Sequence, residues 1–302
     1  MPIRISDIPD ECLIHDHLQE SFSLTEHWEA LQKHDPDELR PLYSSYNLSS
    51  FQINFEEINR EVEEIYSRFE FQGWAKPGTQ KYDRSYGGIA LTQNHNQQLD
   101  WKRGLLGHEE AMKKKFNFSK WKNLVNSKGH FQFLKNTLQE KRRGTYYDSY
   151  SFHIPTKICD EFREIHKITT LFKRPFFRSR IATIPKGHKI EPQEGWHRDE
   201  RLFLFYRAII PLQTNENCKI QVETHEGKKD FSPQVGRAYT FNTRLPHAAF
   251  TTEACNFDRH YLVFCFSPWM DFSREDQSFQ LNEHAGKTHP FDLFNFHTFN
   301  AA

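Results

Sequence analysis

The sequence predicts a mainly β protein with helical additions. Its core is expected to be a double-stranded β-helix, the jelly-roll or cupin-like arrangement, joined to a helix-rich N-terminal part. Up to residue 172, the clearest periodic segments have apolar residues at helical spacing. Beyond that point the apolar residues follow the period of 2 that is typical of strands. These later segments are short, recur at roughly regular intervals and are separated by Pro and Gly, which favours a barrel or jelly roll.

Three segments of the N-terminal half are expected to be helical. Residues 54–70 carry apolar side chains on one face and Glu and Arg on the other. Residues 156–172 have the same spacing, with Thr156 as a plausible N-cap directly after Pro155. A shorter helix is expected within residues 23–31.

Five strands are expected in the C-terminal half. Their predicted ranges are 177–184, 202–210, 218–224, 237–242 and 259–267. Pro211 is expected to end the second strand and Pro268 the last one, because proline lacks the amide hydrogen that a strand ladder uses. Residues 82–92 read as a loop, centred on two glycines, that leads into a short strand.

The chain is expected to divide into three parts. These are an N-terminal region over 1–155, the β-helix core over 156–270 and a tail over 271–302. Residues 94–145 are very polar and contain runs of Lys and Arg, so they are expected to form an insertion with a solvated face or a lid. The tail has weak periodicity and is expected either to wrap the barrel or to be partly disordered.

Composition excludes several classes of protein. Lys and Arg together number 40, as do Asp and Glu, so bulk charge gives no reason to expect binding to nucleic acid or to an anionic membrane. The five cysteines form no CxxC pair, which favours a reduced, cytoplasmic protein over a disulfide scaffold. No stretch is long and apolar enough for a signal peptide or a membrane span. The sequence does not indicate an oligomeric state.

His197, Asp199 and His247 are the candidate metal ligands. Residues two apart on a strand project to the same side, so His197 and Asp199 can both point into the barrel. His247 follows 50 residues later, at a separation where two strands of a jelly roll can lie side by side. Two imidazoles and one carboxylate form the ligand set of non-haem Fe(II) oxygenases. The alternative is that the His-x-Asp pair only caps a turn.

Arg259 and Arg207 are candidates for holding an anion in the barrel. Both arginines occur within otherwise apolar strands, and a buried guanidinium needs an anionic partner. Arginine binds carboxylates in a bidentate manner, so together they could hold a dicarboxylate. The alternative for each is an ordinary arginine on the solvent face of its strand.

The C-terminal half resembles a known enzyme family through several blocks that occur in order. They lie at residues 178–181, 184–190, 196–199, 206–215, 236–242, 246–247 and 258–263. Together they resemble the aspartyl/asparaginyl β-hydroxylase family of Fe(II)- and 2-oxoglutarate-dependent oxygenases. The resemblance covers about a third of the chain, and residues 82–91 match more loosely. Unlike the membrane-anchored members of the family, this protein is expected to act without a membrane anchor or a repeat region, because no segment of the sequence resembles either one.

The resemblance implies a set of cofactors and a role for each candidate residue. His197, Asp199 and His247 would bind Fe(II), and O2 would take an open position on the metal. Arg259 would pair with the distal carboxylate of 2-oxoglutarate, and Arg207 would help to hold this cosubstrate. The reaction would release succinate and CO2 and hydroxylate a C–H bond. The carboxylate of Asp199 favours hydroxylation over halogenation, because related halogenating enzymes lack this ligand.

The expected substrate is an amino acid, a small amino-acid derivative or a residue within a peptide. Five polar or aromatic residues before the barrel are candidate substrate contacts: Tyr82, Arg84, Tyr86, Tyr146 and Asp148. Two other functions stay open. One is a non-catalytic cupin-like module that binds an anion or a metal, and the other is a metal-dependent hydrolase or lyase on the same barrel.

Overall fold

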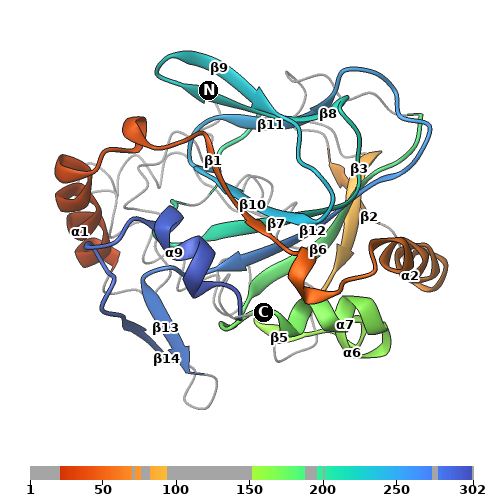
Figure 1. Cartoon of the computed structure of the whole chain (residues 1–302), viewed down its shortest axis with the longest axis horizontal. Helices are drawn as coiled ribbons and strands as arrows, with labels where there is room; N and C mark the ends of the chain where they lie inside the picture. Colours follow the sequence, from red (N-terminus) through yellow and green to blue (C-terminus); the bar gives the residue numbers. More distant parts are fainter. Residues whose placement is uncertain are drawn as a thin grey trace, which may run out of the picture.

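Two antiparallel β-sheets that face each other form the centre of the protein (Figure 1). The architecture is known from a computed structural model that describes residues 21–69, 72–75, 82–93, 152–187, 196–199, 201–273 and 278–300. Helices pack on the side of the large sheet that faces away from the small one. The mainly β class predicted from the sequence is confirmed.

The large sheet has seven strands, and all neighbours in it are antiparallel. In spatial order they are β1 (Tyr43–Asn47), β10 (Arg237–Phe241), β7 (Tyr206–Gln213), β12 (Arg259–Phe266), β6 (Phe177–Ile184), β3 (Tyr82–Ala90) and β2 (Gln72–Ala75). The central strands β6 and β12 are buried along their whole length. Strands covered on both faces read as nearly continuous apolar runs, which explains the composition of β12.

The small sheet lies opposite the middle of the large one. Its strands, in spatial order, are β11 (His247–Thr251), β8 (Cys218–Thr224) and β9 (Gly227–Phe231). A single bridge between His197 and His247 adds residue 197 at the β11 edge. The chain passes between the sheets repeatedly, from β6 to residue 197, to β7, to β8 and β9, to β10, to β11 and back to β12. This alternation is the strand order of a jelly roll.

The remaining elements surround this core. The helices are α1 (Ser21–His34), α2 (Phe55–Arg68), α6 (Ile158–Glu161), α7 (Arg163–Thr170) and α9 (Pro290–His297), with 3₁₀ turns η4 (Asp37–Leu39) and η5 (Ser49–Phe51). Two short pairs of strands are β4 (Thr92–Gln93) with β5 (Ile154–Pro155), and β13 (Met270–Ser273) with β14 (Ser278–Leu281). The tail is therefore folded over its described residues, where β13, β14 and α9 follow the barrel.

A helix-rich N-terminal part is not confirmed. Among its described residues, helices α1 and α2 are accompanied by strands β1, β2 and β3, all of which join the large sheet. The division of the chain at residues 155 and 270 stays a prediction.

Helix α2 follows the sequence prediction closely. The side chain of Asn54 accepts a hydrogen bond of 3.1 Å from the backbone N–H of Glu57, which is the usual N-cap contact. Ile58, Val62 and Ile65 are fully buried on one face. Burial of each such side chain contributes about 1.5–3 kcal/mol, so this face fixes the helix against the large sheet.

The single helix predicted over 156–172 is wrong, because the chain breaks at Phe162. This residue is extended, with φ −106° and ψ 115°, and separates α6 from α7. The carboxylate of Glu61 on α2 accepts hydrogen bonds from the backbone N–H groups of Glu164 (2.8 Å) and Ile165 (3.0 Å). These are unsatisfied donors in the first turn of α7, so a side chain about a hundred residues away stabilises a new helix start.

Strand β7 also differs from its prediction. It begins at Tyr206 and continues through Pro211 to Gln213, although Pro211 was expected to end it. The register with β12 shifts between His260 and Tyr261, where Tyr261 lies opposite Pro211. A bulge at this point accommodates a residue that cannot donate to the ladder.

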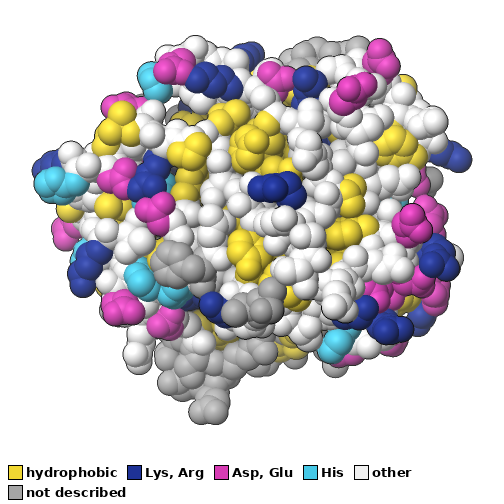
Figure 2. All heavy atoms as spheres, viewed as in Figure 1, with side chains coloured by type: hydrophobic (Ala, Val, Ile, Leu, Met, Phe, Trp, Pro, Cys, Tyr) yellow, Lys and Arg dark blue, Asp and Glu magenta, His cyan; other side chains and the backbone are white. Residues whose placement is uncertain are grey.

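Charge is mixed on the surface. Figure 2 shows acidic and basic side chains interspersed on the face in view, in agreement with the zero net charge. Within the described part of the chain, no helix combines the length and apolar character needed to cross a membrane.

Candidate metal centre

The three candidate ligands are brought together by one short pairing of the backbone. His197 and His247 exchange two backbone hydrogen bonds, each of 3.0 Å, and the N–H of Asp199 donates to the carbonyl of Thr243 at 2.9 Å. Residues that exchange both bonds lie directly opposite each other, so their side chains project to the same side. The two imidazole rings are 4.2 Å apart at their centroids.

The ligand atoms of His197, Asp199 and His247 all lie within 4.8 Å of one another. Oδ2 of Asp199 is 3.3 Å from Nε2 of His247 and 3.7 Å from Nε2 of His197. Two imidazole nitrogens and one carboxylate oxygen clustered in this way fit the facial ligand set of an octahedral Fe(II) ion. The sequence therefore singled out three residues that the fold does gather.

The protonation state of His247 suits a ligand. Burial lowers its pKa to about 4, so the ring is neutral at neutral pH. Nδ1 lies 2.9 Å from the carbonyl oxygen of Leu245 and donates its hydrogen there. This contact leaves the lone pair of Nε2 free to face a metal, which is the usual way a backbone carbonyl orients a ligating histidine.

Arg207 lies beside the carboxylate of the candidate centre. Its Nη1 forms an ion pair with Oδ2 of Asp199, and its side chain is buried. Burial, together with the nearby charges of Arg180 and Arg178, lowers the pKa of Arg207 to about 10, so the guanidinium stays protonated at neutral pH. The interior next to Asp199 is thus cationic.

Sequence reasoning gave no role to Arg178 and Arg180, although both are buried on β6. The signal that could have found them is two arginines, two residues apart, on a strand that is apolar on both sides.

Arg259 is buried between the two sheets, with only 1% of its surface exposed. Its Nε donates to the hydroxyl of Tyr261 (2.8 Å) and its Nη1 to the carbonyl of Phe250 on β11 (3.1 Å). Its Nη2 is 3.5 Å from the carbonyl of Lys219 on β8. Within the described part of the chain, no carboxylate forms an ion pair with it. A buried cation with only neutral partners is costly, so this position favours an anionic ligand.

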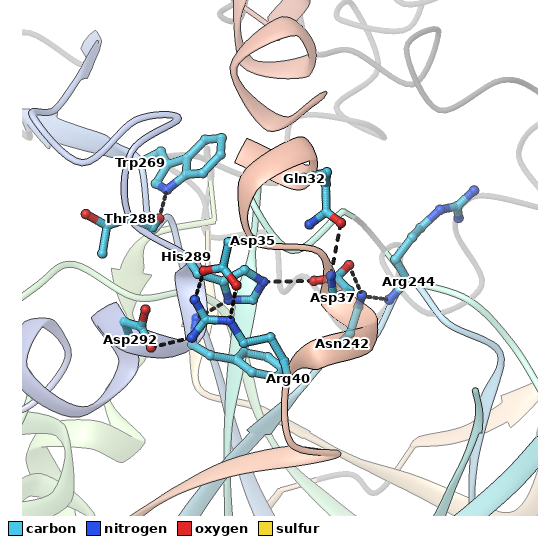
Figure 3. Close-up of polar contacts among 11 residues, drawn as sticks. Gln32, Asp35, Asp37, Arg40, Asn242, Arg244, Trp269, Thr288, His289 and Asp292 are labelled. Atoms are coloured by element: carbon cyan, nitrogen blue, oxygen red, sulfur yellow. Dashed lines mark hydrogen bonds and ion pairs between the residues drawn. The ribbon is translucent and has the colours of Figure 1, made fainter. Parts of the chain in front are cut away.

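The loop that leads to His247 is held by a network from both ends of the chain (Figure 3). Asp37 of η4 accepts hydrogen bonds of 2.8 Å from Nδ2 of Asn242 and from Nε2 of His289, the N-cap of α9. Oδ1 of Asn242 accepts from the N–H of Arg244 (3.1 Å), and Nη1 of Arg244 donates to the carbonyl of Asp199 (3.3 Å). No local pattern in the sequence indicated this support.

The expected substrate contacts are only partly placed. Tyr82, Arg84 and Tyr86 belong to β3, which begins at Tyr82, so the loop expected there is strand. Only the backbone of these residues is described. Tyr146 and Asp148 lie outside the described residues, as does the expected insertion at 94–145.

No family model and no curated protein sequence matches the chain. Solved structures with a similar fold include a prolyl hydroxylase from Trichoplax adhaerens in complex with a hypoxia inducible factor peptide. It is 12% identical, with a TM-score of 0.38 over 84% of this chain and 96% of that one. An oxidoreductase of the 2OG-Fe(II) oxygenase family from Burkholderia pseudomallei is also 12% identical, with a TM-score of 0.35 over 80% and 89%.

A third similar structure is a full-length protein from Neurospora crassa in complex with alpha-KG and 5-formyluracil. It is 9% identical, with a TM-score of 0.37 over 93% of this chain and 98% of that one. Likeness at these scores and identities carries no weight for the activity of this chain, so the proposal below rests on its own residues.

Proposed function

We propose that the chain is an Fe(II)- and 2-oxoglutarate-dependent dioxygenase. It hydroxylates an unactivated C–H bond of an amino acid, an amino-acid derivative or a residue in a peptide, and releases succinate and CO2. One observation carries the proposal. The ligand atoms of His197, Asp199 and His247 cluster within 4.8 Å in the same barrel that buries Arg259 without a carboxylate partner among the described residues.

His197 and His247 are each proposed to bind Fe(II) through Nε2, and Asp199 through a carboxylate oxygen. This ligand set would leave positions on the ion open for the cosubstrate and O2. With these groups bound, the metal supplies the oxidation of a C–H bond coupled to decarboxylation of 2-oxoglutarate. The protein's own contribution is to fix the ligands, exclude water and orient the substrate.

Arg259 is proposed to bind the distal carboxylate of 2-oxoglutarate. A guanidinium matches a carboxylate with two parallel hydrogen bonds, and burial between the sheets strengthens the pairing. The tyrosine hydroxyl and the two backbone carbonyls around it fix its orientation in advance.

Arg207 is proposed to help hold the same cosubstrate, and its ion pair with Asp199 puts a second cation close to the proposed metal. The candidate substrate contacts stay Tyr82, Arg84, Tyr86, Tyr146 and Asp148.

The decisive experiment is an anaerobic titration of the metal-stripped chain with Fe(II) and 2-oxoglutarate. We expect a weak metal-to-ligand charge-transfer band in the visible, and succinate once O2 and a suitable amino acid or peptide are added. His247→Ala and Asp199→Ala should abolish Fe(II) binding at this centre, whereas Arg259→Ala should weaken the binding of 2-oxoglutarate and leave the affinity of the centre for Fe(II) largely intact. Absence of both the band and succinate across a broad substrate panel would point instead to a non-catalytic cupin-like module.

A further inference from the structure

A second cluster of metal-binding side chains lies outside the candidate centre. Single ligand atoms of Glu63, Asp258 and His260 lie within 4.8 Å of one another. Glu63 comes from α2, Asp258 from the turn before β12, and His260 from β12 itself. Two segments that are remote in sequence, α2 and the start of β12, therefore supply one imidazole and two carboxylates to the same point.

His260 is completely buried, and its Nε2 has no hydrogen-bond partner within the described part of the chain. The nearest carboxylate oxygen, Oε1 of Glu63, is 4.0 Å away, which is too far for a hydrogen bond. A buried polar atom without a partner costs about 1–3 kcal/mol, and such atoms in folded proteins call for a ligand or an ordered water. Here the atom is aimed at two carboxylates.

The other ring nitrogen of His260 is already engaged. Nδ1 lies 2.8 Å from Oγ1 of Thr183, which in turn shares a hydrogen bond with the hydroxyl of Tyr66. The tautomer in which Nδ1–H donates to Thr183 presents the lone pair of Nε2 to a metal. The ring of Tyr66 also stacks on the imidazole, with centroids 5.6 Å apart, and fixes its plane. Contacts of this kind orient the histidine ligands of metal sites.

Charge favours a cation at this point. Nε2 of His260 and one carboxylate oxygen each from Glu63 and Asp258 lie within 4.8 Å of one another. Two carboxylates close to one imidazole nitrogen attract a cation. Figure 2 shows further acidic side chains over α2, at the right edge of the view.

The cluster is separate from the candidate iron centre. Neighbouring side chains on a strand point to opposite faces. Arg259 points between the sheets, where it reaches β8 and β11, whereas His260 points to the outer face beneath α2. The carboxylate of Asp258 is fixed by the backbone N–H of Lys186 at 2.6 Å, and Glu63 is exposed. The outer face thus offers an ion a route from solvent.

We propose that Glu63, Asp258 and His260 form a second metal site, specific for a divalent transition-metal ion such as Zn²⁺. One imidazole nitrogen and two carboxylate oxygens are a mixed ligand set that Zn²⁺ accepts, with water completing the coordination. A bound ion would link α2 to β12 and so stabilise the packing of the helix on the large sheet. The site does not depend on the proposed oxygenase activity.

The test is the zinc stoichiometry of the full-length, metal-stripped chain by equilibrium dialysis. In the double variant His197→Ala/His247→Ala, which disables the first centre, we expect one Zn²⁺ per chain to remain. Adding Glu63→Gln or Asp258→Asn to this background should lower the affinity for that zinc ion by about tenfold or more, since losing even a group that only supports a ligand typically costs about 10- to 100-fold. Zinc should also raise the melting temperature of the double variant, and this rise should vanish in the same triple variants.

Glu64→Gln is the matched control, because Glu64 is the next residue of α2 and pairs only with Arg68 among the described contacts. It should leave zinc binding unchanged. Glu63 and Asp258 are exposed or half-buried, so their variants are expected to fold, which circular dichroism checks. The proposal fails if the double variant binds no zinc. It also fails if Glu63→Gln and Glu64→Gln bind zinc equally well.

Discussion

At the level of single residues, the position of Arg259 depends on the hydroxyl of Tyr261. Burial raises the pKa of Tyr261, so the hydroxyl keeps its hydrogen and accepts from Nε of Arg259 at 2.8 Å. We expect Tyr261→Phe to lower the free energy of unfolding by about 1.5–3 kcal/mol, the range for a hydrogen bond to a charged group. The KM for 2-oxoglutarate should rise with little change in kcat. Unchanged urea unfolding and unchanged KM would contradict this role.

Arg207 and the metal are expected to compete for the carboxylate of Asp199. The guanidinium pairs with Oδ2, one of the three atoms proposed to bind Fe(II). Arg207→Gln should therefore raise the affinity for Fe(II) alone and lower the affinity for 2-oxoglutarate. Anaerobic calorimetry with each ligand measures both. Arg237→Gln is the control, because Arg237 is a partly exposed residue of β10 that donates a hydrogen bond to Ser45. It should change neither the affinity for Fe(II) nor that for 2-oxoglutarate. Loss of both affinities in Arg207→Gln would show that the residue is only structural.

At the level of elements, η4 and the N-terminus of α9 are expected to hold the loop that carries His247. Asp37→Ala removes the carboxylate that accepts two hydrogen bonds, one from Asn242 and one from His289 (Figure 3). Each of these part-buried hydrogen bonds contributes about 0.5–1.5 kcal/mol, so the free energy of unfolding should fall by about 1–3 kcal/mol. The loop loosens, and Fe(II) affinity should fall several-fold. Denaturant unfolding and metal titration measure the two effects, with Glu38→Ala as the control. Equal metal affinity in both variants would rule out support through Asp37.

The same elements explain which parts of the fold local patterns could predict. Strands β6 and β8 have the bounds predicted for them, because their patterns and turn signals lie within a few residues of each strand. Helix α7 was missed as a separate element, since its start depends on Glu61 from α2. Strand β7 passes through Pro211 because a shift in β12 compensates for the missing donor. In both cases the element depends on a partner that is distant in the sequence, so a local pattern could not predict it.

At the level of the whole molecule, the candidate site was predictable where strand alternation alone positions side chains. His197 and Asp199 share a side for that reason, and His247 meets them because a jelly roll places the two segments next to each other. The spacing of residues along the chain could not predict how Asp37 reaches Asn242, or how Glu63 reaches His260. Those contacts depend on where the helices and turns outside the barrel settle, which only the complete fold determines.

Two of the buried imidazoles, those of His247 and His260, should also make the metal-free chain less stable in mild acid. Burial lowers the pKa of both His247 and His260 to about 4, from the 6.5 of a free histidine side chain. As the pH falls below 6.5, the unfolded chain therefore binds protons that the folded chain cannot. Each histidine should cost up to about 1.4 kcal/mol per pH unit across this window, until the folded chain is also protonated near pH 4.

Urea unfolding at pH 7.5, 6.5 and 5.5 in the presence of a chelator measures this loss before most carboxylates titrate. His260→Gln should remove about half of the loss in free energy of unfolding that the two histidines cause as the pH falls. The part due to His247 should remain. Zn²⁺ and Fe(II) bind neutral imidazole, so either ion should oppose the acid effect at the histidine it contacts. A free energy of unfolding that stays constant from pH 7.5 to 5.5 in the parent chain would contradict the buried, neutral state of both rings.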